Sequence, residues 1–360
     1  MAVPNLSVVK DAVNWPQVQT ASFVAGCGMN VPERVVDNNH FASYLETTDE
    51  WIRERTGIAE RRWSAPEVCA SELAEPAARE AIAHAGLTIA DIDAIIVATV
   101  TPDYSFPSTA CLLQRRLGSV CGLAFDLNAV CSGFVYALVT ADALIASGQC
   151  RNALVVGVDI YSYIINPKDR GTCILFGDGA GAVVLSAAAP AGNPGGASRW
   201  ASGSAGALRG IYASELGADG NGANLLYVPN GTASRPTPES YAAGEHFLRM
   251  DGREVFKVAV RRLCDISEKV LARAGIAVGQ VDYFITHQAN KRIVLSMAKH
   301  LGVDESKVLV NIHKYGNTSA ASIPMLLAES AAEGKIKHGD LLLVTAFGGG
   351  FTWGGVLLRW

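Results

Sequence analysis

The sequence lacks the features of metal-binding, secreted and membrane proteins. Its eight cysteines (residues 27, 69, 111, 121, 131, 150, 173 and 264) form no CxxC pair, and no histidine stands at metal-ligand spacing. No apolar run approaches the roughly 20 residues of a membrane span. Residues 1–19 lack the basic and apolar regions of a signal peptide. We therefore expect no metal site, no membrane partner and a reducing, cytoplasmic location.

Charge is also scarce. Charged residues make up 18% of the chain and the net charge is -4, which is not typical of a nucleic-acid-binding protein. Hydrophobic residues make up 49%, which suits buried parallel strands. A chain of 360 residues exceeds the size at which a single core stops growing. One large domain or two closely packed domains are expected.

An internal repeat is visible in the sequence. Residues 84–97 (HAGLTIADIDAIIV) match residues 273–286 (RAGIAVGQVDYFIT) at an offset of 273 − 84 = 189. Each copy is typical of a helix stopped by glycine, a short loop and a buried strand. The repeat predicts an α/β fold made of two similar halves, although a duplication alone carries no functional content.

The repeat continues downstream. Residues 123–128 and 308–313 are predicted to be short strands, each followed by a helix of small residues and a further strand (153–158 and 341–345). The helices end at Gly148 and Gly334, and Cys131 and Asn317 each precede their glycine by 17 residues. We therefore expect these two residues at equivalent helix starts. His287 matches Ala98 at a strand end by the 189-residue offset. Ligands bind at such ends in open α/β sheets.

Stretches rich in glycine, serine and proline suggest the domain boundaries. Residues 187–208 are predicted to be a linker or insertion, and residues 217–243 a second long loop. The expected organisation is an extension (1–19), a first half with the nucleophile (20–186), the linker (187–208) and a second half with His and Asn (209–360).

Three residues could carry chemistry. Cys131 lies where a predicted strand turns into a helix, and a helix start favours thiolate over thiol; a packed core cysteine is the alternative. His287 follows a predicted strand and could transfer a proton near neutral pH, or could be a core histidine. Asn317 could equally be a helix cap.

Two glycine-rich segments are candidates for binding loops. The backbone amides of Gly348–Gly350 follow a predicted strand and could form an oxyanion hole. The segment Gly177–Gly181 lacks the third glycine of a dinucleotide-binding loop, and a strand (182–185) is predicted to follow it. This segment is predicted to be a structural turn.

Together these segments resemble the type III β-ketoacyl-acyl-carrier-protein synthases, thiolase-like enzymes that begin bacterial fatty-acid synthesis. The resemblance covers residues 22–360. It rests on TDEWIRERTG (48–57), FDLNAVCSGFVYAL (125–138), DRGT (169–172), FGDGAG (176–181), HQAN (287–290), GNTSAAS (316–322) and FGGGFTW (347–353), which occur in the family's order.

The resemblance implies a five-layered αβαβα fold of two duplicated halves, usually as a homodimer. Cys131 would take an acyl group from acyl-CoA, with the amides of Cys131 and Gly349 holding the oxyanion. Malonyl-acyl-carrier protein would then lose CO2 to give an enolate stabilised by His287 and Asn317, and its carbon would attack the acyl group. Acyl-CoA is a substrate here, so no cofactor is implied.

The resemblance also assigns binding residues. Trp51 would stack on the CoA adenine, with Arg170 on the other side of that ring. The remaining assignments are Arg55 and Thr56 for the nucleotide, Gly171, Ala289, Asn290 and Phe256 for the pantetheine channel, Phe106 for the acyl pocket across the dimer, and Lys257 and Arg292 for the carrier protein. A solvated helix face is the alternative for the last two. Arg253 stands where many members of the family have Asn. The resemblance therefore leaves open whether residue 253 contacts the pantetheine tunnel.

Three other functions are compatible with these residues. A related synthase could prime a polyketide or another secondary pathway, because the acyl pocket is assembled from scattered side chains. Cys, His and Asn also serve cysteine hydrolases, although those enzymes have no reason to contain this duplication. A non-catalytic acyl-binding protein of the same fold would be expected to lose one of the three residues. The identity of the acyl primer stays open.

Overall fold

Two β-sheets carry the two halves of the chain in the computed structural model, which describes residues 21–188, 209–234 and 236–360. The first sheet has the order β1-β7-β6-β4-β5 and the second β11-β12-β13-β8. Their strands are β1 (Ser22–Asn30), β4 (Ala94–Ala98), β5 (Leu123–Leu127), β6 (Asn152–Ile160), β7 (Asp178–Ala187), β8 (Gly210–Ala218), β11 (Tyr283–Thr286), β12 (Leu341–Gly348) and β13 (Thr352–Arg359). The predicted extension 1–19, and the linker except for residues 187 and 188, lie outside the described residues.

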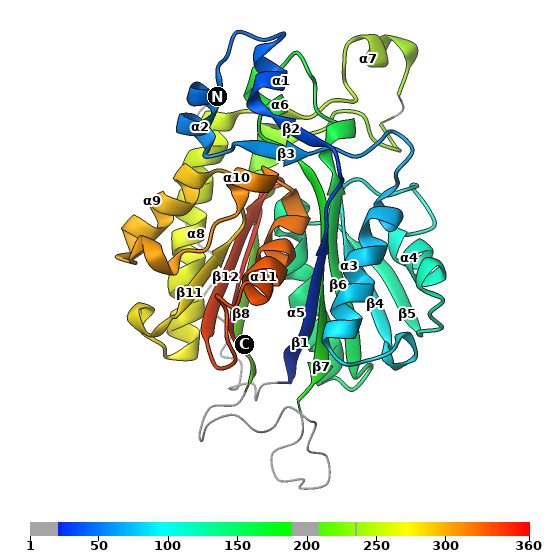
Figure 1. Ribbon diagram of the computed structural model, residues 1–360, viewed down its shortest axis with the longest axis vertical. Helices are drawn as coiled ribbons and strands as arrows, with labels where there is room; N and C mark the ends of the chain where they lie inside the picture. The colour runs from blue at the N-terminus through cyan, green and yellow to red at the C-terminus, as the bar shows by residue number, and fades with distance from the viewer. Residues whose placement is uncertain (1–20, 189–208, 235) are drawn as a thin grey trace, which may run out of the picture.

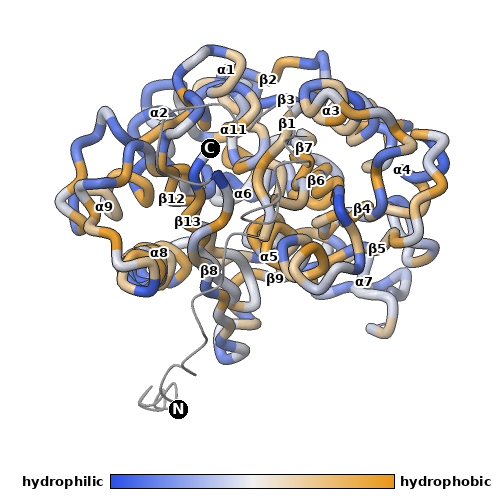
Figure 2. The backbone as a smooth tube through the Cα atoms, turned by 90° about the horizontal axis from the view of Figure 1, so that it is seen from below, coloured by the Kyte–Doolittle hydropathy of each residue, from blue (hydrophilic) through white to orange (hydrophobic). Residues whose placement is uncertain are grey.

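Helices and sheets alternate in five layers (Figure 1). Helices α3 (Ala70–His84) and α4 (Thr109–Leu117) cover the outer face of the first sheet, and α8 (Gly252–Ala274) and α9 (Lys291–Leu301) cover that of the second. Between the sheets lie α5 (Gly133–Ala146) and α11 (Ser322–Ala332), whose small apolar residues are packed from both sides. Figure 2 shows the hydrophobic residues concentrated in the strands and in α5. This is the predicted αβαβα arrangement.

The two halves have corresponding strands, because β1, β7, β6 and β4 occupy the same order as β8, β13, β12 and β11. Strand β4 is parallel to β6 as β11 is to β12. The first residues of β4 and β11, Ala94 and Tyr283, are 283 − 94 = 189 positions apart. Gly86 and Gly275, also 189 apart, follow α3 and α8 with the same left-handed φ of 67°. The structure therefore confirms the duplication.

The predicted strand 308–313 is wrong. Val308 makes an isolated parallel bridge to Phe284, and the helix α10 (Ile312–Tyr315) begins four residues later. Asn311 leaves the extended region, with φ −130° and ψ 7°, and so turns the chain out of the sheet. Residues after α10 instead cross to the first half, where Asn317 bridges Phe176. In the described residues, the second sheet therefore has no full counterpart of β5.

The expected equivalence of Cys131 and Asn317 is also wrong. The 3-10 turn η2 (Val130–Ser132) before α5 matches η7 (Ser319–Ala321) before α11 at an offset of 319 − 130 = 189. Val130 and Ser319 share an unusual φ of 50°. Cys131 therefore corresponds to Ala320. The count of 17 residues back from Gly148 and from Gly334 did not give equivalent positions, because α11 has 11 residues and α5 has 14.

Two predicted irregular segments contain regular structure. Most of Gly177–Gly181 belongs to β7 rather than to a turn, and a Cβ at Gly181 would come within 2.5 Å of the Met325 backbone nitrogen. Glycine is needed there because α11 packs directly on the strand. The long loop 217–243 contains η4 (Gly220–Leu225), β9 (Leu226–Tyr227) and α7 (Pro238–Ala242). The strand β9 pairs with β10 (Arg249–Met250).

Gly157 of β6 is a point of close backbone contact between the two halves. A Cβ at this position would lie 2.2 Å from the Ala320 carbonyl oxygen, which is backbone and cannot rotate away. We expect Gly157→Ala to lower the free energy of unfolding by about 1–3 kcal/mol, as overpacking does. The change is measured by chemical denaturation. Gly279→Ala, where nothing lies within 4 Å of the new Cβ, is the matched control. Equal stability of the two variants would contradict the close packing.

Candidate active site

The three predicted reactive residues line one cavity of about 270 Å³. Cys131 comes from the turn η2, His287 follows β11, and Asn317 follows α10. His287 follows a strand and Cys131 precedes α5, as the sequence predicted, whereas Asn317 follows the short helix α10 instead of the predicted strand. Much of the remaining wall is apolar, with Phe176 and Phe347 among its residues. The cavity thus brings one thiol, one imidazole and one amide together in largely apolar surroundings.

Cys131 is 5% exposed and lies under the backbone of β12. A Cβ at Gly348 would come within 2.8 Å of the Cys131 amide nitrogen, so only glycine lets β12 approach it. The Ser319 hydroxyl donates to the Cys131 sulfur across 3.5 Å. Burial raises the pKa of the thiol to about 12, although hydrogen bonds from Ser319 and Tyr161 oppose that rise. The sequence predicts that the helix start favours the thiolate, and burial acts in the opposite direction.

His287 is held in one orientation. Its backbone N–H donates to the Thr345 carbonyl across 2.8 Å, and its Nδ1 lies 2.6 Å from the Ser322 hydroxyl oxygen. That oxygen also accepts the Gln288 amide at 3.3 Å. When the Ser322 hydroxyl donates to Nδ1, the ring proton is on Nε2. Burial lowers the pKa of His287 to about 3, so the ring is neutral. The Nε2 atom is buried without a hydrogen-bond partner among the described residues.

Both oxygen atoms of Asn317 accept hydrogen bonds from other residues of the protein. Its backbone N–H donates to the Leu175 carbonyl at 2.8 Å, and its own carbonyl accepts the Gly177 N–H at 3.0 Å. The side-chain Oδ1 accepts the Ser319 N–H at 2.9 Å. The Nδ2 group is consequently the part of the side-chain amide that can donate a hydrogen bond to a molecule in the cavity. His287 and Asn317 thus supply two N–H donors near one thiol.

The outer part of the cavity contains the residues predicted to bind CoA. They are Trp51, Arg55 and Thr56 from α2 (Asp49–Thr56), Arg170 and Gly171 from α6 (Arg170–Cys173), and Phe256, Ala289 and Asn290. The guanidinium groups of Arg170 and Arg55 lie 4.8 and 5.6 Å from the Trp51 ring centroid. The Asn290 amide donates to the Arg55 carbonyl at 3.1 Å, which ties α9 to α2.

Other predicted site residues lie off the cavity wall. Phe106 is 85% exposed, and Lys257 and Arg292 are exposed on α8 and α9. The Lys257 ammonium lies 2.6 Å from Glu254. Arg253 is exposed and is not among the residues that line the cavity. Gly348, rather than Gly349, lines the wall.

Four residues that contact the reactive groups or shift their pKa were missed by sequence reasoning. They are Asp159, Tyr161, Ser319 and Ser322. The two serines lie within the segment 316–322 that carries part of the resemblance, which could have indicated them. Asp159 and Tyr161 lie at the end of a buried strand and gave no sequence indication, because their effect on the pKa of Cys131 depends on how distant segments pack.

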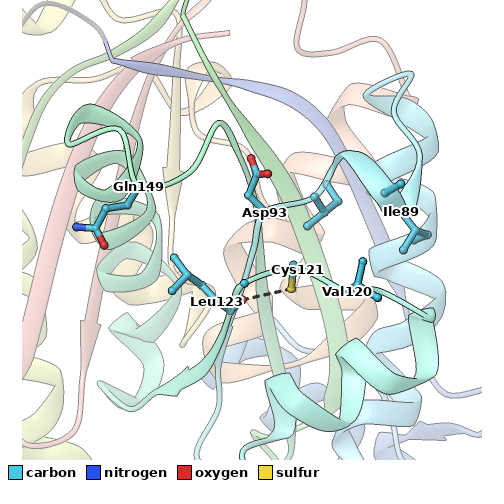
Figure 3. Close-up of a pocket in the computed structure, with 9 residues that line it drawn as sticks. Ile89, Asp93, Val120, Cys121, Leu123 and Gln149 are labelled. Carbon is cyan, nitrogen blue, oxygen red and sulfur yellow. Dashed lines mark hydrogen bonds between the residues drawn. The ribbon is translucent and has the colours of Figure 1, made fainter.

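A second cavity, of about 480 Å³, lies at the amino ends of β4 and β5 (Figure 3). Its acidic residue, Asp93, already accepts the backbone amides of Arg151 and Asn152 at 2.8 and 2.9 Å. None of the predicted reactive residues belongs to it. Among the described residues, no cluster of His, Cys, Asp or Glu could hold a metal ion, and no helix could cross a membrane.

The chain is similar to known proteins over most of its length. Residues 125–204 match the family model for 3-oxoacyl-[acyl-carrier-protein] synthase III, and residues 271–360 match the model for its C-terminal part. The chain is 49% identical over 339 residues to β-ketoacyl-[acyl-carrier-protein] synthase III of Paracoccus denitrificans, which covers 94% of this chain and 99% of the relative.

Solved structures extend the comparison. The 3-oxoacyl-[acyl-carrier-protein] synthase III of Aquifex aeolicus is 44% identical, with a TM-score of 0.83 over 94% of this chain and 100% of the other. The priming β-ketosynthase of the R1128 polyketide pathway is 32% identical, with a TM-score of 0.84 over 97% and 99%. This chain therefore belongs to the β-ketoacyl-acyl-carrier-protein synthase III family of acyl-transferring condensing enzymes.

Proposed function

We propose that this enzyme loads an acyl group from acyl-CoA onto Cys131 and condenses it with malonyl-acyl-carrier protein, the initiating step of fatty-acid synthesis. The observation that carries the proposal is the meeting of one thiol and two N–H donors in a single apolar cavity. A thiol suits the covalent acyl intermediate, and two donors suit a developing enolate oxygen.

In the acylation step, the Cys131 sulfur attacks the thioester carbon of acyl-CoA. The backbone amides of Cys131 and Gly349 are proposed to hold the oxyanion that forms. The bond between the acyl carbon and the CoA sulfur then breaks, and the proton of the Cys131 thiol ends on that sulfur. Because burial raises the pKa of this thiol to about 12, the proton must leave as the attack proceeds.

Acyl-CoA binding is proposed to use the outer residues. Arg55, Thr56 and Arg170 would contact the nucleotide, and Gly171, Phe256, Ala289 and Asn290 would line the channel of the pantetheine. An adenine between Trp51 and Arg170 needs about 7 Å between them, twice an atomic contact of about 3.5 Å. The present separation is 4.8 Å, so Arg170 must move away from the Trp51 ring when the nucleotide binds.

In the condensation step, the malonyl group loses CO2 and its electron pair forms an enolate. The enolate oxygen would accept hydrogen bonds from Nε2 of His287 and Nδ2 of Asn317. The enolate carbon attacks the acyl carbon on Cys131, the carbon–sulfur bond breaks, and the released thiolate takes a proton from solvent. The product is the 3-oxoacyl-carrier protein. Acyl-CoA is a substrate in this scheme, and we propose that no cofactor takes part.

The proposal for the partners rests on the charge and the exposure of surface residues. Lys257 and Arg292 are exposed cations on α8 and α9 that could meet an acidic carrier protein. A homodimer is supported by β5, which pairs on only one side, with β4, among the described residues, and by the exposed Phe106. Phe106 would then close the acyl pocket of the partner subunit. We propose a cytoplasmic location.

The alternatives are less well supported. A hydrolase needs a base for its nucleophile, whereas burial lowers the pKa of His287 to about 3 and makes its ring a poor base. A non-catalytic protein would not be expected to keep all three residues in one cavity. Polyketide priming is represented among the similar structures, but at 32% identity against 49% for the β-ketoacyl-[acyl-carrier-protein] synthase III of Paracoccus denitrificans.

Cys131→Ser should abolish acyl-enzyme formation, because a buried serine hydroxyl has far less access to its anion than a thiol. Intact-mass measurement after incubation with a panel of acyl-CoAs checks this and also identifies the primer. Cys150→Ser, which changes a buried cysteine that does not line the cavity, is the control and should still be acylated. A stoichiometric acyl adduct on Cys131→Ser would remove Cys131 from the nucleophile role.

His287→Ala and Asn317→Ala should separate the two half-reactions. Each should leave acylation of Cys131 measurable, because backbone amides hold that oxyanion. Each should slow malonyl decarboxylation on the order of 10²-fold or more, as loss of an oxyanion donor does. The losses should be less than additive, because both donors serve one oxygen. Release of labelled CO2 and formation of acyl-enzyme are followed separately.

The opposite pattern would favour the hydrolase-like arrangement. If His287→Ala stops acylation as completely as Cys131→Ser while decarboxylation survives, then His287 is chiefly a base for the nucleophile.

Lys257→Glu and Arg292→Glu should raise the KM for malonyl-carrier protein much more than the KM for acyl-CoA, because charge reversal opposes docking of an acidic partner. High salt should have the same effect in the parent enzyme. Lys269→Glu, on the same helix as Lys257 but three turns further on, is the control. Equal losses for both substrates would show that these two cations are not the carrier site.

A further inference from the structure

One buried serine outside the cavity wall contacts the imidazole of His287. Ser322 is the first residue of α11, which lies between the two sheets (Figure 1), and it is 2% exposed. Its hydroxyl oxygen lies 2.6 Å from Nδ1 of His287. The Nε2 atom on the opposite edge of the ring has no hydrogen-bond partner in the part of the chain that the structure describes, and His287 lines the cavity. The serine thus binds one ring nitrogen and leaves the other for a molecule in the cavity.

The backbone next to the ring is fixed to the same serine. The Gln288 N–H donates to the Ser322 hydroxyl oxygen at 3.3 Å. The Gln288 side chain is fixed in turn, because its Nε2 donates to the Thr286 carbonyl at 2.7 Å and its Oε1 accepts the Asn311 N–H at 3.2 Å. The ring of His287 and the serine hydroxyl therefore keep one position relative to each other.

The hydrogen-bond partners of this hydroxyl determine which ring nitrogen carries the proton. Among the described residues, Nδ1 of His287 is the only acceptor within hydrogen-bonding distance of the Ser322 hydroxyl, since the Gln288 N–H is a donor. If Nδ1 carried the proton and donated it to the serine, the hydroxyl proton would be buried without an acceptor, which is unfavourable. A ring protonated on both nitrogens is excluded at neutral pH, because burial lowers the pKa of His287 to about 3. The arrangement with the ring proton on Nε2 is therefore favoured.

The second N–H donor of the site is fixed by the same stretch of chain. Ser319 lies just before Ser322, and its backbone N–H donates to Oδ1 of Asn317 at 2.9 Å. This bond uses the amide oxygen, so Nδ2 is the side-chain atom left to donate. Residues 319–322 thus set the direction of both hydrogen-bond donors, one through a backbone N–H and the other through a hydroxyl.

We propose that Ser322 is a positioning residue whose hydroxyl donates to Nδ1 of His287 and so keeps the ring proton on Nε2, available to the substrate. A protonated Nε2 donates to the enolate oxygen that malonyl decarboxylation forms. The opposite tautomer would turn a lone pair toward that oxygen and would be suited to act as a base for the Cys131 thiol. The serine therefore commits the imidazole to hydrogen-bond donation. This inference rests on the proposed function, which makes the malonyl enolate the species that His287 stabilises.

The protonated ring nitrogen can be observed directly by NMR. The full-length enzyme is labelled with 15N in the rings of its seven histidines, and each ring nitrogen is correlated at neutral pH with the carbon-bound ring protons. Nε2 couples to both of these protons and Nδ1 chiefly to one, which distinguishes the two nitrogens. The signals of His287 are those that His287→Ala lacks. We expect a protonated Nε2 and an unprotonated Nδ1. A protonated Nδ1 overturns the proposal.

Ser322→Ala removes the hydroxyl and keeps a helix-forming residue at the start of α11. The Nδ1 signal of His287 should move toward that of a ring nitrogen without a hydrogen bond. Release of CO2 from malonyl-carrier protein should slow about tenfold, the effect of one lost hydrogen bond, whereas acylation of Cys131 should keep the parent rate. Ser330→Ala changes another buried serine of α11 and is the matched control, so it should equal the parent in all three measurements.

A general loosening of α11 would give a different pattern. The proposal fails if Ser322→Ala releases CO2 at the rate of Ser330→Ala, or if acylation and CO2 release fall together. If the parent enzyme takes no acyl group from any acyl-CoA, the proposed function fails, while the protonated nitrogen of His287 still decides the role of Ser322.

Discussion

The site depends on the packing of the turn η7 of the second half against β6 of the first. The Ala320 carbonyl lies where any side chain at position 157 would stand, so the two backbones are in direct contact. That contact places Ser319 on the Cys131 sulfur, and Asp159 fastens it by accepting the Ala320 N–H. The helix that follows the turn carries Ser322, which orients His287. One interface between the halves thus positions every reactive group.

The same interface buries the groups that it brings together, and burial decides their charges. It raises the pKa of Cys131 to about 12 and lowers that of His287 to about 3, so both are neutral at physiological pH. A neutral imidazole with its proton on Nε2 is suited to donating to an enolate oxygen and poorly suited to deprotonating a thiol.

Local patterns in the sequence predicted the duplication, and the resemblance predicted the layers and the three residues that the cavity brings together. The 189-residue offset holds from Gly86 and Gly275 to the turns η2 and η7, because both halves build the same units. It fails at the helix ends, where α11 is three residues shorter than α5, and this misplaced Asn317 relative to Cys131. The contact of Ser319 with Cys131 was not predictable from local patterns, since it spans 188 positions of sequence and depends on tertiary packing.

The duplicated turns show how two similar halves acquire different tasks. Val130 and Ser319 occupy equivalent positions and share a φ of 50°, so the backbone geometry is the same in both. In the first half the next residue is Cys131, whose sulfur faces the cavity. In the second half the next residue is Ala320, which leaves room for β6 at Gly157. Because the two turns contact each other, the Cys131 sulfur of one half meets the Ser319 hydroxyl of the other.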